Sequence, residues 1–314
     1  MLVGAGQLGS RHLQGLIYSN FKLSINVVDS SSESLTNSRE RWAGAGGEAS
    51  PHHVRWLTEL PSDLPEIDVA IIATSSKGRA DIVCALSELS TVRFWVLEKV
   101  LTQASIELEV LQSATLRSQG AWVNIPRRMM AGYQSLKRIL PGQDPFSASF
   151  SGGLWGLACN CIHFIDLVSW LSGESLIGVD INGLNDNWYE SKRPGYFETT
   201  GELVAHFEGG TNLRLNSEMG EDMKPIRVVL NNGVLWEIDE SKGIFRSSDG
   251  LQFDGRIEPQ SQLSGRLVDS ILNRGRCDLP TLVESSATHK IIVDAMLIHW
   301  NRSQNRNDEL VPIT

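Results

Sequence analysis

Residues 3–12, Val-Gly-Ala-Gly-Gln-Leu-Gly-Ser-Arg-His, decide the fold of this chain. The stretch has glycines at the spacing Gly-x-Gly-x-x-Gly, between an apolar lead-in and a helix-like apolar pattern. Gly4 permits a tight turn, Gly6 lets a pyrophosphate approach the backbone, and Gly9 lets the helix lie close to the strand. The helix N-terminus then offers free N–H groups and a partial positive charge to an anion. This pattern predicts a dinucleotide site formed by Gly4, Gly6, Gln7, Leu8 and Gly9, against the alternative of an ordinary βα turn.

A second β-rich run supports this interpretation. Residues Leu23–Val28 end in Asp29, twenty residues after Gly9. A dinucleotide fold places an acid there to hold the ribose hydroxyls. Ser30 follows Asp29 with no adjacent arginine, and the carboxylate would repel a 2′-phosphate, so we expect NAD rather than NADP.

Composition excludes several classes of protein. With 314 residues, the chain is long enough for two domains of about 100–200 residues each. A net charge of −9 argues against a nucleic-acid partner. No run approaches the roughly 20 apolar residues of a membrane span, and no signal-peptide pattern is present. The scattered cysteines (Cys84, Cys159, Cys161 and Cys277) indicate a reducing compartment, so we expect a cytoplasmic protein, and we predict no metal site.

Strand and helix patterns alternate up to about residue 125. Residues 68–74 form a continuous apolar run, as in a strand buried on both faces of a parallel sheet, and Ser75 follows them. A later strand-like run, residues 93–97, ends in Glu98-Lys99. We therefore predict a doubly wound parallel (Rossmann) sheet in a dinucleotide-binding domain, residues 1–122. Thr74, Ser75, Glu98 and Lys99 are assigned to the cofactor site, because ligands bind at the carboxyl ends of such strands. Only three residues precede Gly4, so either the first strand is unusually short or the natural chain begins upstream.

The second half has a different pattern. After a break at Pro141-Gly142, strand-like runs follow one another without helices between them from Leu203 onward. Asn231-Asn232-Gly233 between two of these runs is a hairpin signal. We predict an α+β domain, residues 123–314, with a mostly antiparallel open sheet and late helices over residues 260–274 and 281–303.

One helix, expected over residues 157–172, separates polar from apolar side chains. At about 100° per residue, Cys159, His163, Asp166 and Trp170 lie on one face. His163 and Asp166 are three residues apart, so the acid can orient the imidazole and raise its basicity. The alternative is a surface His–Asp pair.

The chain resembles the Gfo/Idh/MocA family of NAD(P)-dependent oxidoreductases over essentially its whole length. The resemblance rests on the glycine loop, on Glu98-Lys99, and on Leu279-Pro280-Thr281. It also rests on Cys159-x-Cys161-x-His163-x-x-Asp166, which follows the family's Asp-x-Gly-x-His-x-x-Asp pattern. The resemblance implies action on sugars, inositols and related compounds, with Lys99 at the nicotinamide and substrate and His163 as the general base on the substrate hydroxyl.

The chain departs from the family pattern at several positions. Val100 replaces the proline of Glu-Lys-Pro, and Ser75, Ser76 and Arg79 stand where a Pro-Asn-x-x-His pattern is frequent. Cys159 replaces the helix acid, and a thiol cannot act as a carboxylate. Either Asp166 substitutes for that acid, or Lys99 and His163 act alone, or hydride chemistry has been lost.

These observations predict an NAD-dependent dehydrogenase or reductase of a sugar, polyol or sugar derivative, with an acidic or nucleotide-linked substrate favoured. An NAD(H)-binding sensor or assembly partner is one alternative, and hydrolase chemistry with a retained NAD redox cycle is another. The family resemblance also implies a homodimer or homotetramer joined through the sheet of the second domain, whose uncovered apolar face would otherwise be exposed. The predicted catalytic residues are Lys99, His163 and Asp166, and the predicted substrate-binding residues are Lys99, Asn124, Arg127, Cys159 and His163.

Overall fold

The computed structural model describes residues 1–140 and 144–314, so the predicted Pro141-Gly142 break lies outside the described residues. The chain forms two compact units. The first unit comprises residues 1–102, 106–124 and 258–283, and the second comprises residues 103–105, 125–257 and 284–314. A single boundary at residue 122 therefore does not describe the division, because residues 258–283 return to the first unit.

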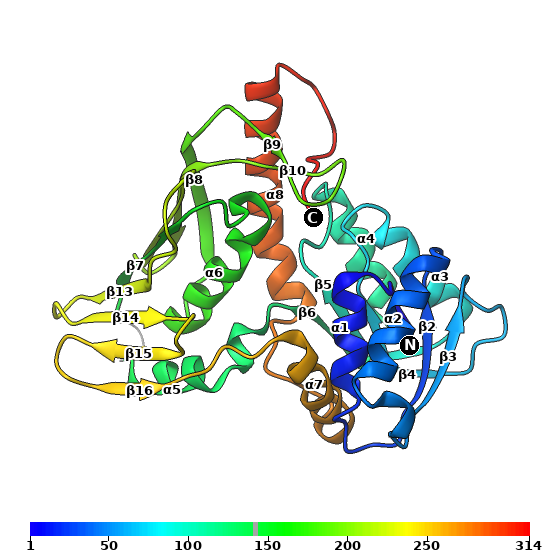
Figure 1. The fold of residues 1–314 in the computed structure, drawn as a ribbon. Coiled ribbons are helices and arrows are strands. Elements are labelled where there is room, and N and C mark those ends of the chain that lie inside the picture. The colour runs from blue at the N-terminus through cyan, green and yellow to red at the C-terminus, as the bar shows by residue number, and fades with distance from the viewer. Residues whose placement is uncertain (141–143) are drawn as a thin grey trace. The chain divides into compact units, whose positions relative to one another are not determined.

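The first unit contains a six-stranded parallel sheet (Figure 1). Its strand order is β3-β2-β1-β4-β5-β6, so the direction of the connections reverses between β1 and β4. In a doubly wound sheet, this reversal is where the ligand binds, at the carboxyl ends of the strands. The predicted Rossmann fold is confirmed. The strands are β1 (Leu2–Val3), β2 (Ser24–Val28), β3 (His53–Leu57), β4 (Ile67–Ile72), β5 (Val92–Glu98) and β6 (Gly120–Asn124).

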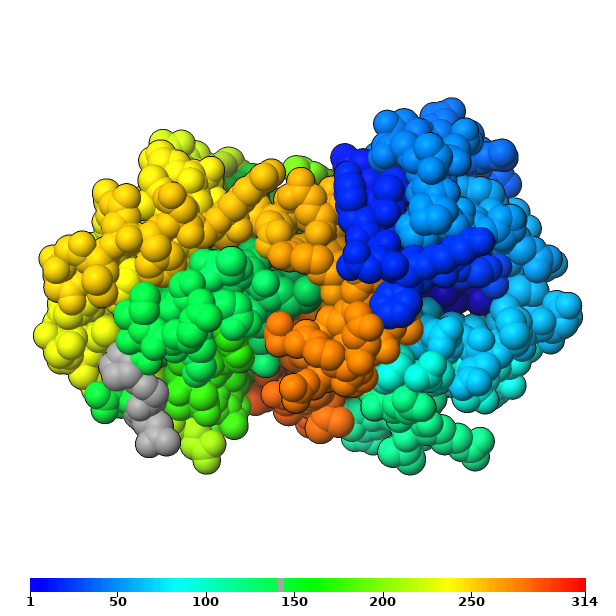
Figure 2. Space-filling view, turned by 90° about the horizontal axis from the view of Figure 1, so that it is seen from below, coloured from blue at the N-terminus to red at the C-terminus, as the bar shows by residue number. Residues whose placement is uncertain are grey.

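Five α-helices accompany this sheet in the described part of the first unit: α1 (Gln7–Leu16), α2 (Ser32–Gly44), α3 (Arg79–Leu89), α4 (Ile106–Thr115) and α7 (Gln260–Arg274), with a short 3₁₀ turn η1 (Gly47–Ala49). α1 packs against α2 and α7, and α3 packs against α4. In Figure 2, the dark blue segment that includes α1 lies beside the orange segment that includes α7.

Close packing explains why α7 belongs to the first unit. A Cβ built on Gly265 would lie 2.8 Å from the carbonyl oxygen of Gly15, so the two helices approach at glycines. Asp269 of α7 also accepts hydrogen bonds from the Ser19 hydroxyl (2.5 Å) and the Asn20 side-chain amide (2.6 Å). The helical periodicity of the sequence predicts α7 itself. These contacts join residues about 250 positions apart, so no local sequence pattern predicts them.

The second unit contains an eight-stranded sheet of order β16-β15-β14-β13-β7-β12-β11-β8. β7 and β12 are parallel and the other neighbours are antiparallel, which confirms the predicted mostly antiparallel sheet. The predicted hairpin at Asn231–Gly233 joins β13 to β14. The strands are β7 (Phe146–Gly152), β8 (Leu176–Leu184), β11 (Gly201–Phe207), β12 (Asn212–Ser217), β13 (Ile226–Leu230), β14 (Leu235–Asp239), β15 (Ile244–Ser247) and β16 (Gln252–Asp254), beside a separate hairpin of β9 (Tyr189–Glu190) and β10 (Phe197–Glu198).

The remaining helical elements are η2 (Pro126–Met129), α5 (Ala131–Ile139), α6 (Leu157–Ser172) and α8 (Leu282–Gln304). α6 packs against β12, so its apolar face is buried as its periodicity predicted. β7 was not predicted from the sequence, although Phe146, Ala148 and Phe150 alternate with serines and are buried. Among residues 1–140 and 144–314, no helix is both long and apolar enough to cross a bilayer.

The other face of this sheet is mostly polar. Serines project from β7 at residues 147, 149 and 151, and the exposed Arg214 of β12 pairs with Glu202 of β11. Arg227 and Arg246 both pair with Glu237 of β14. These central strands therefore do not present the uncovered apolar face through which subunits were expected to join.

Candidate functional site

The glycine loop (Gly4–Gly9) has the shape that a phosphate cradle needs. Gly4 has φ +94°, and a Cβ there would lie 2.8 Å from the carbonyl carbon of Ala73. A Cβ on Gly9 would lie 1.8 Å from the Gly4 carbonyl oxygen, so α1 contacts the end of β1 through this glycine. Gly6 instead faces open space, and it gives α1 no side-chain cap. The helix N-terminus is thus accessible to an anion.

Asp29 lies directly beside this loop. Its Oδ2 accepts a hydrogen bond from the Ala5 N–H (2.6 Å), and its Oδ1 accepts one from the Ser31 N–H (2.8 Å). A carboxylate oxygen has a second lone pair, so each one can still accept a ribose hydroxyl. A hollow of about 550 Å³, lined by Gly6, Gln7 and residues of α2, adjoins the loop.

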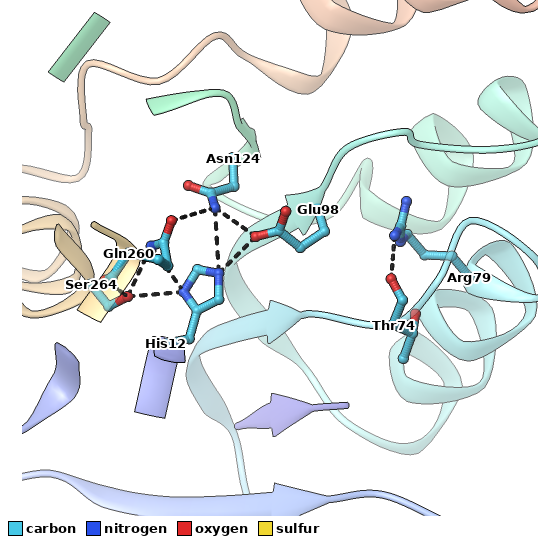
Figure 3. Close-up of polar contacts among 7 residues, drawn as sticks. All are labelled: His12, Thr74, Arg79, Glu98, Asn124, Gln260 and Ser264. Carbon is cyan, nitrogen blue, oxygen red and sulfur yellow. Dashed lines mark hydrogen bonds and ion pairs between the residues drawn. The ribbon is translucent and has the colours of Figure 1, made fainter. Parts of the chain in front are cut away.

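The end of β4 contributes Thr74. Within the described part of the chain, the Thr74 hydroxyl is buried and has no hydrogen-bond partner, which suits a ligand contact. The Thr74 carbonyl accepts a hydrogen bond from Arg79 (Figure 3). Arg79 is fully buried and also donates to the carbonyls of Val100 and Leu101 (2.9 Å for Leu101). Arg79 therefore ties the end of β4 to the segment after Lys99.

A buried polar network surrounds Glu98 at the end of β5 (Figure 3). We call it the His12 network, and it comprises His12, Glu98, Asn124, Gln260 and Ser264. Glu98 Oε1 lies 2.7 Å from His12 Nε2 and accepts a hydrogen bond from Asn124 Nδ2 (2.6 Å). Asn124 Nδ2 also donates to Gln260 Oε1 (2.8 Å), and Ser264 Oγ lies 2.9 Å from His12 Nδ1. The network links α1, β5, β6 and α7.

The hydrogen-bond roles in the network follow from Glu98. An ionised carboxylate only accepts, so His12 donates its Nε2–H to Glu98, and Ser264 Oγ is the hydrogen-bond partner of its Nδ1. For the same reason Asn124 must turn its NH₂ toward Glu98. Its Oδ1 is buried and has no partner in the described part of the chain. The network thus fixes the end of β5, the strand from which Lys99 follows.

Sequence reasoning assigned Glu98 to the cofactor and Asn124 to the substrate. The structure places both inside the His12 network, with 3% and 4% of their surfaces exposed. His12 was not predicted as a site residue, although it is the last residue of the stretch 3–12 that contains the glycine loop. Its partners on α7 lie about 250 residues away, so the sequence around His12 could not reveal them.

The second unit has its own cavity, of about 740 Å³, which contains His163 and Arg127. Phe150, Trp155 and Phe164 form an aromatic wall there, with Phe150 and Phe164 stacked at 4.2 Å between ring centroids. Aromatic faces pack well against the C–H face of a sugar. Of the predicted site residues, this cavity brings together His163 and Arg127. Lys99 belongs to the first unit and His163 to the second.

Arg127 is held by a buried ion pair. Its Nε and Nη2 donate to the two oxygens of Glu240 (2.8 Å each), and the Tyr133 hydroxyl donates to Glu240 Oε1 (2.6 Å). The guanidinium also lies over the Phe164 ring, 4.5 Å from its centroid. Burial acts to raise the pKa of Glu240, but Arg127 and Tyr133 outweigh it and the pKa lies below its usual value.

Asp166 is engaged by Arg128 rather than by His163. Arg128 Nε donates to one carboxylate oxygen (2.9 Å) and Nη2 to the other (2.7 Å). Burial raises the pKa of Asp166 to about 6, and the Arg128 guanidinium opposes that rise. The contact with His163 predicted from helical spacing is thus replaced by an ion pair with the crossover segment η2. The half-buried Cys159 lies one turn before His163, and its Sγ lies 3.6 Å from the Gly156 carbonyl oxygen.

Comparison with known proteins finds similarity at the level of structure. No family model and no curated protein sequence matches the chain. A UDP-N-acetylglucosamine 3-dehydrogenase from Acidithiobacillus ferrooxidans is 14% identical with a TM-score of 0.68, covering 98% of this chain and 96% of that one. A myo-inositol dehydrogenase from Lactobacillus casei, in complex with NAD(H) and myo-inositol, is 15% identical with a TM-score of 0.65, covering 100% and 96%.

An oxidoreductase from Agrobacterium radiobacter, in complex with NAD⁺, L-tartaric acid and magnesium, is 11% identical with a TM-score of 0.69, covering 93% of each chain. Identities this low establish the fold alone. The chain has the fold of these oxidoreductases, as its resemblance to the Gfo/Idh/MocA family predicted.

Proposed function

We propose that this protein is an NAD-dependent oxidoreductase that transfers hydride between nicotinamide and a hydroxyl or keto carbon of a sugar, polyol or sugar derivative. The observation that carries the proposal is the glycine loop, in which Gly4 and Gly9 have no room for a side chain while Gly6 faces open space beside Asp29. The similar structures, two of which hold NAD⁺ or NAD(H), support the same conclusion.

The residues present fit NAD. The glycine-loop backbone would hold the pyrophosphate and Asp29 the ribose hydroxyls, and the buried Thr74 hydroxyl has no partner among residues 1–140 and 144–314. Ser30 and Ser75 adjoin these positions. NADP is disfavoured because the Asp29 carboxylate would face its 2′-phosphate. When bound, the nicotinamide supplies a two-electron acceptor or donor at one carbon.

The chain's own residues would handle the proton and the substrate. The Lys99 ammonium would hydrogen-bond the reacting oxygen and stabilise its developing negative charge. An imidazole nitrogen of His163 would take the hydroxyl proton. The aromatic wall would pack on the sugar, and Arg127 would line its site. Asp166 would support the arrangement through Arg128, because both its oxygens are already bound.

The test combines binding with turnover. We expect the protein to bind NADH and to reduce NAD⁺ with at least one compound in a panel of polyols, sugars, sugar acids and nucleotide sugars. Lys99→Ala and His163→Ala should each lower kcat at least 100-fold and leave NADH affinity within about threefold. The exposed Lys77→Ala and His206→Ala are matched controls and should keep full activity. Turnover that survives both site substitutions would contradict the proposed roles.

A sensor or assembly partner is the second candidate, because Cys159 stands where the family has an acid. Tight NADH binding without a rate on any substrate in the panel would favour it. The proposed homodimer or homotetramer can be measured separately by light scattering of the intact chain.

Cofactor choice has its own test. Asp29→Ala should relax the preference for NAD over NADP by about tenfold or more, because one repulsive charge is removed and about 1.4 kcal/mol is tenfold. Asp81→Ala, an exposed acid in the first turn of α3, is the control. Unchanged selectivity would mean that Asp29 does not contact the ribose.

A further inference from the structure

Glu198, at the end of β10, places a buried carboxylate at the amino end of α6. The residue is 5% exposed. Its Oε2 accepts hydrogen bonds from the backbone N–H groups of Ala158 (2.8 Å) and Cys159 (3.3 Å). These are first-turn N–H groups, which have no partner within the helix. A carboxylate thus reaches α6 from a strand 39 residues further along the chain.

Glu198 meets backbone donors at the amino end of α6. Backbone N–H donors and the positive end of a helix dipole both stabilise a carboxylate over the neutral acid. Gly156 permits the approach, because a Cβ there would lie 3.1 Å from Glu198 Oε1. Burial, followed by the charges of Glu198 and Cys159, raises the pKa of the neighbouring Tyr189 to about 12.

Cys159, one of the two residues whose N–H groups donate to Glu198, lies one helical turn before His163 on α6. Cys159 and His163 are four residues apart, so they share a helix face with about 5–6 Å between their Cβ atoms. Side chains in a helix lean toward its N-terminus, which inclines the His163 imidazole toward the Cys159 turn. Two charges about 8 Å apart at an effective dielectric constant of about 20 interact by about 2 kcal/mol, or roughly 1.5 pKa units, and salt screening lowers this toward about 1 unit.

We propose that Glu198 is a positioning residue that supplies the carboxylate charge which Cys159 cannot, and so stabilises the protonated imidazole of His163. The proposal rests on the proposed function, in which His163 accepts one proton from the substrate hydroxyl. Glu198 itself exchanges no proton and forms no bond to substrate.

The other charges around His163 mostly form pairs of their own. Arg127 is bound to Glu240, Lys242 to Asp239, and Asp166 to Arg128. Because these pairs are near neutral, their fields at His163 largely cancel. The titratable and charged groups around His163 include Cys159, Cys161 and Asp166 from α6, Arg127 and Arg128 from η2, Tyr189 from β9, Glu198 from β10, Lys224 from the segment before β13, and Asp239, Glu240 and Lys242 at and after the end of β14.

The first experiment measures the His163 imidazole pKa by NMR titration of the intact, ligand-free chain, with His163→Gln identifying the resonance. Glu198→Gln keeps an oxygen that can accept from Ala158 and Cys159 but removes the charge. We expect the His163 pKa to fall by about 1 unit. Glu190→Gln, on the paired strand β9 and exposed, is the matched control and should leave it unchanged. Glu198→Asp, which keeps the charge and retracts it by one methylene, should give a smaller fall.

The second experiment returns the acid to the helix. With an active substrate, Glu198→Gln should lower kcat roughly tenfold and change KM little. Adding Cys159→Asp to Glu198→Gln should restore both the His163 pKa and kcat. An unchanged His163 pKa in Glu198→Gln overturns the proposal, and so does loss of thermal stability as the only effect, since that is what a helix cap alone would give. A wild-type chain without turnover would refute the proposed function, but the titration would still decide the role of Glu198.

Discussion

The two units bury carboxylates beside their candidate site residues in opposite ways. In the first unit, Glu98 is held by the His12 imidazole and the Asn124 amide. In the second unit, Glu240 and Asp166 are each held by two hydrogen bonds from an arginine. Both arrangements fix a segment next to a predicted catalytic or substrate-binding residue, Lys99 or Arg127.

The difference matters for what each unit tolerates. The His12 network depends on every donor finding an acceptor, so a substitution that preserves the hydrogen bonds should be mild. A buried ion pair depends on both charges, because removing one leaves the other without compensation in a poorly solvated site. The same kind of substitution should therefore cost more in the second unit than in the first.

The largest effect is expected at Arg127. Arg127→Met leaves the Glu240 carboxylate buried without its counter-charge and should lower the free energy of unfolding by about 3–5 kcal/mol. Adding Glu240→Gln should return much of that loss, because the stranded charge is gone. Denaturant unfolding followed by tryptophan fluorescence measures both. The exposed Arg246→Met is the control, and a double variant no more stable than the single one would contradict the ion-pair explanation.

The sequence predicts several of the elements that surround these buried carboxylates, but it does not predict the contacts that the carboxylates make. The glycine loop, α6 and α7 were predicted because turn chemistry and helical periodicity are local. β7 was missed, since its serines alternate with only a few apolar residues and resemble a loop. The arginine partners of Glu240 and Asp166 could not be predicted, because each contact joins residues 38 or more positions apart.

The same limit applies to the candidate site. Glu98, Lys99 and His163 were identified from motifs, whereas His12, Arg79 and Glu198 act through long-range contacts that no motif encodes. The sequence shows that Cys159 stands where the family pattern has a helix acid. Only the fold shows that a carboxylate from β10 reaches the same turn.

A smaller effect, with a characteristic pH dependence, is expected at Asp166. Burial raises its pKa in the folded state to about 6 from 3.8, so the folded protein holds this proton more tightly than the unfolded chain. The resulting stability is present below pH 3.8 and is lost as pH rises through about 6, by up to about 3 kcal/mol.

Asp166→Asn removes that titration. Between pH 4.5 and 7.5, the wild-type chain should lose stability relative to this variant as pH rises, measured as the difference in unfolding free energy. A difference that stays constant with pH would show that Arg128 fully offsets the burial of Asp166. The Arg128–Asp166 pair would then behave like the Arg127–Glu240 pair. The two pairs would no longer differ in the direction in which the carboxyl pKa is shifted.

The smallest effect is expected for Glu98→Gln in the first unit. In Glu98→Gln, the new amide oxygen can still accept from His12 Nε2–H and Asn124 Nδ2–H, so only the charge assistance is lost, about 1 kcal/mol. Glu98→Leu removes the acceptor and strands both buried donors, at about 1–3 kcal/mol for each. The unfolding free energies of the two variants, measured under the same conditions, separate the effect of losing the charge from the effect of losing the hydrogen-bond acceptor. If Glu98→Gln cost as much as Arg127→Met, the His12 network would depend on the Glu98 charge in the way that the second unit depends on its arginine–carboxylate pairs.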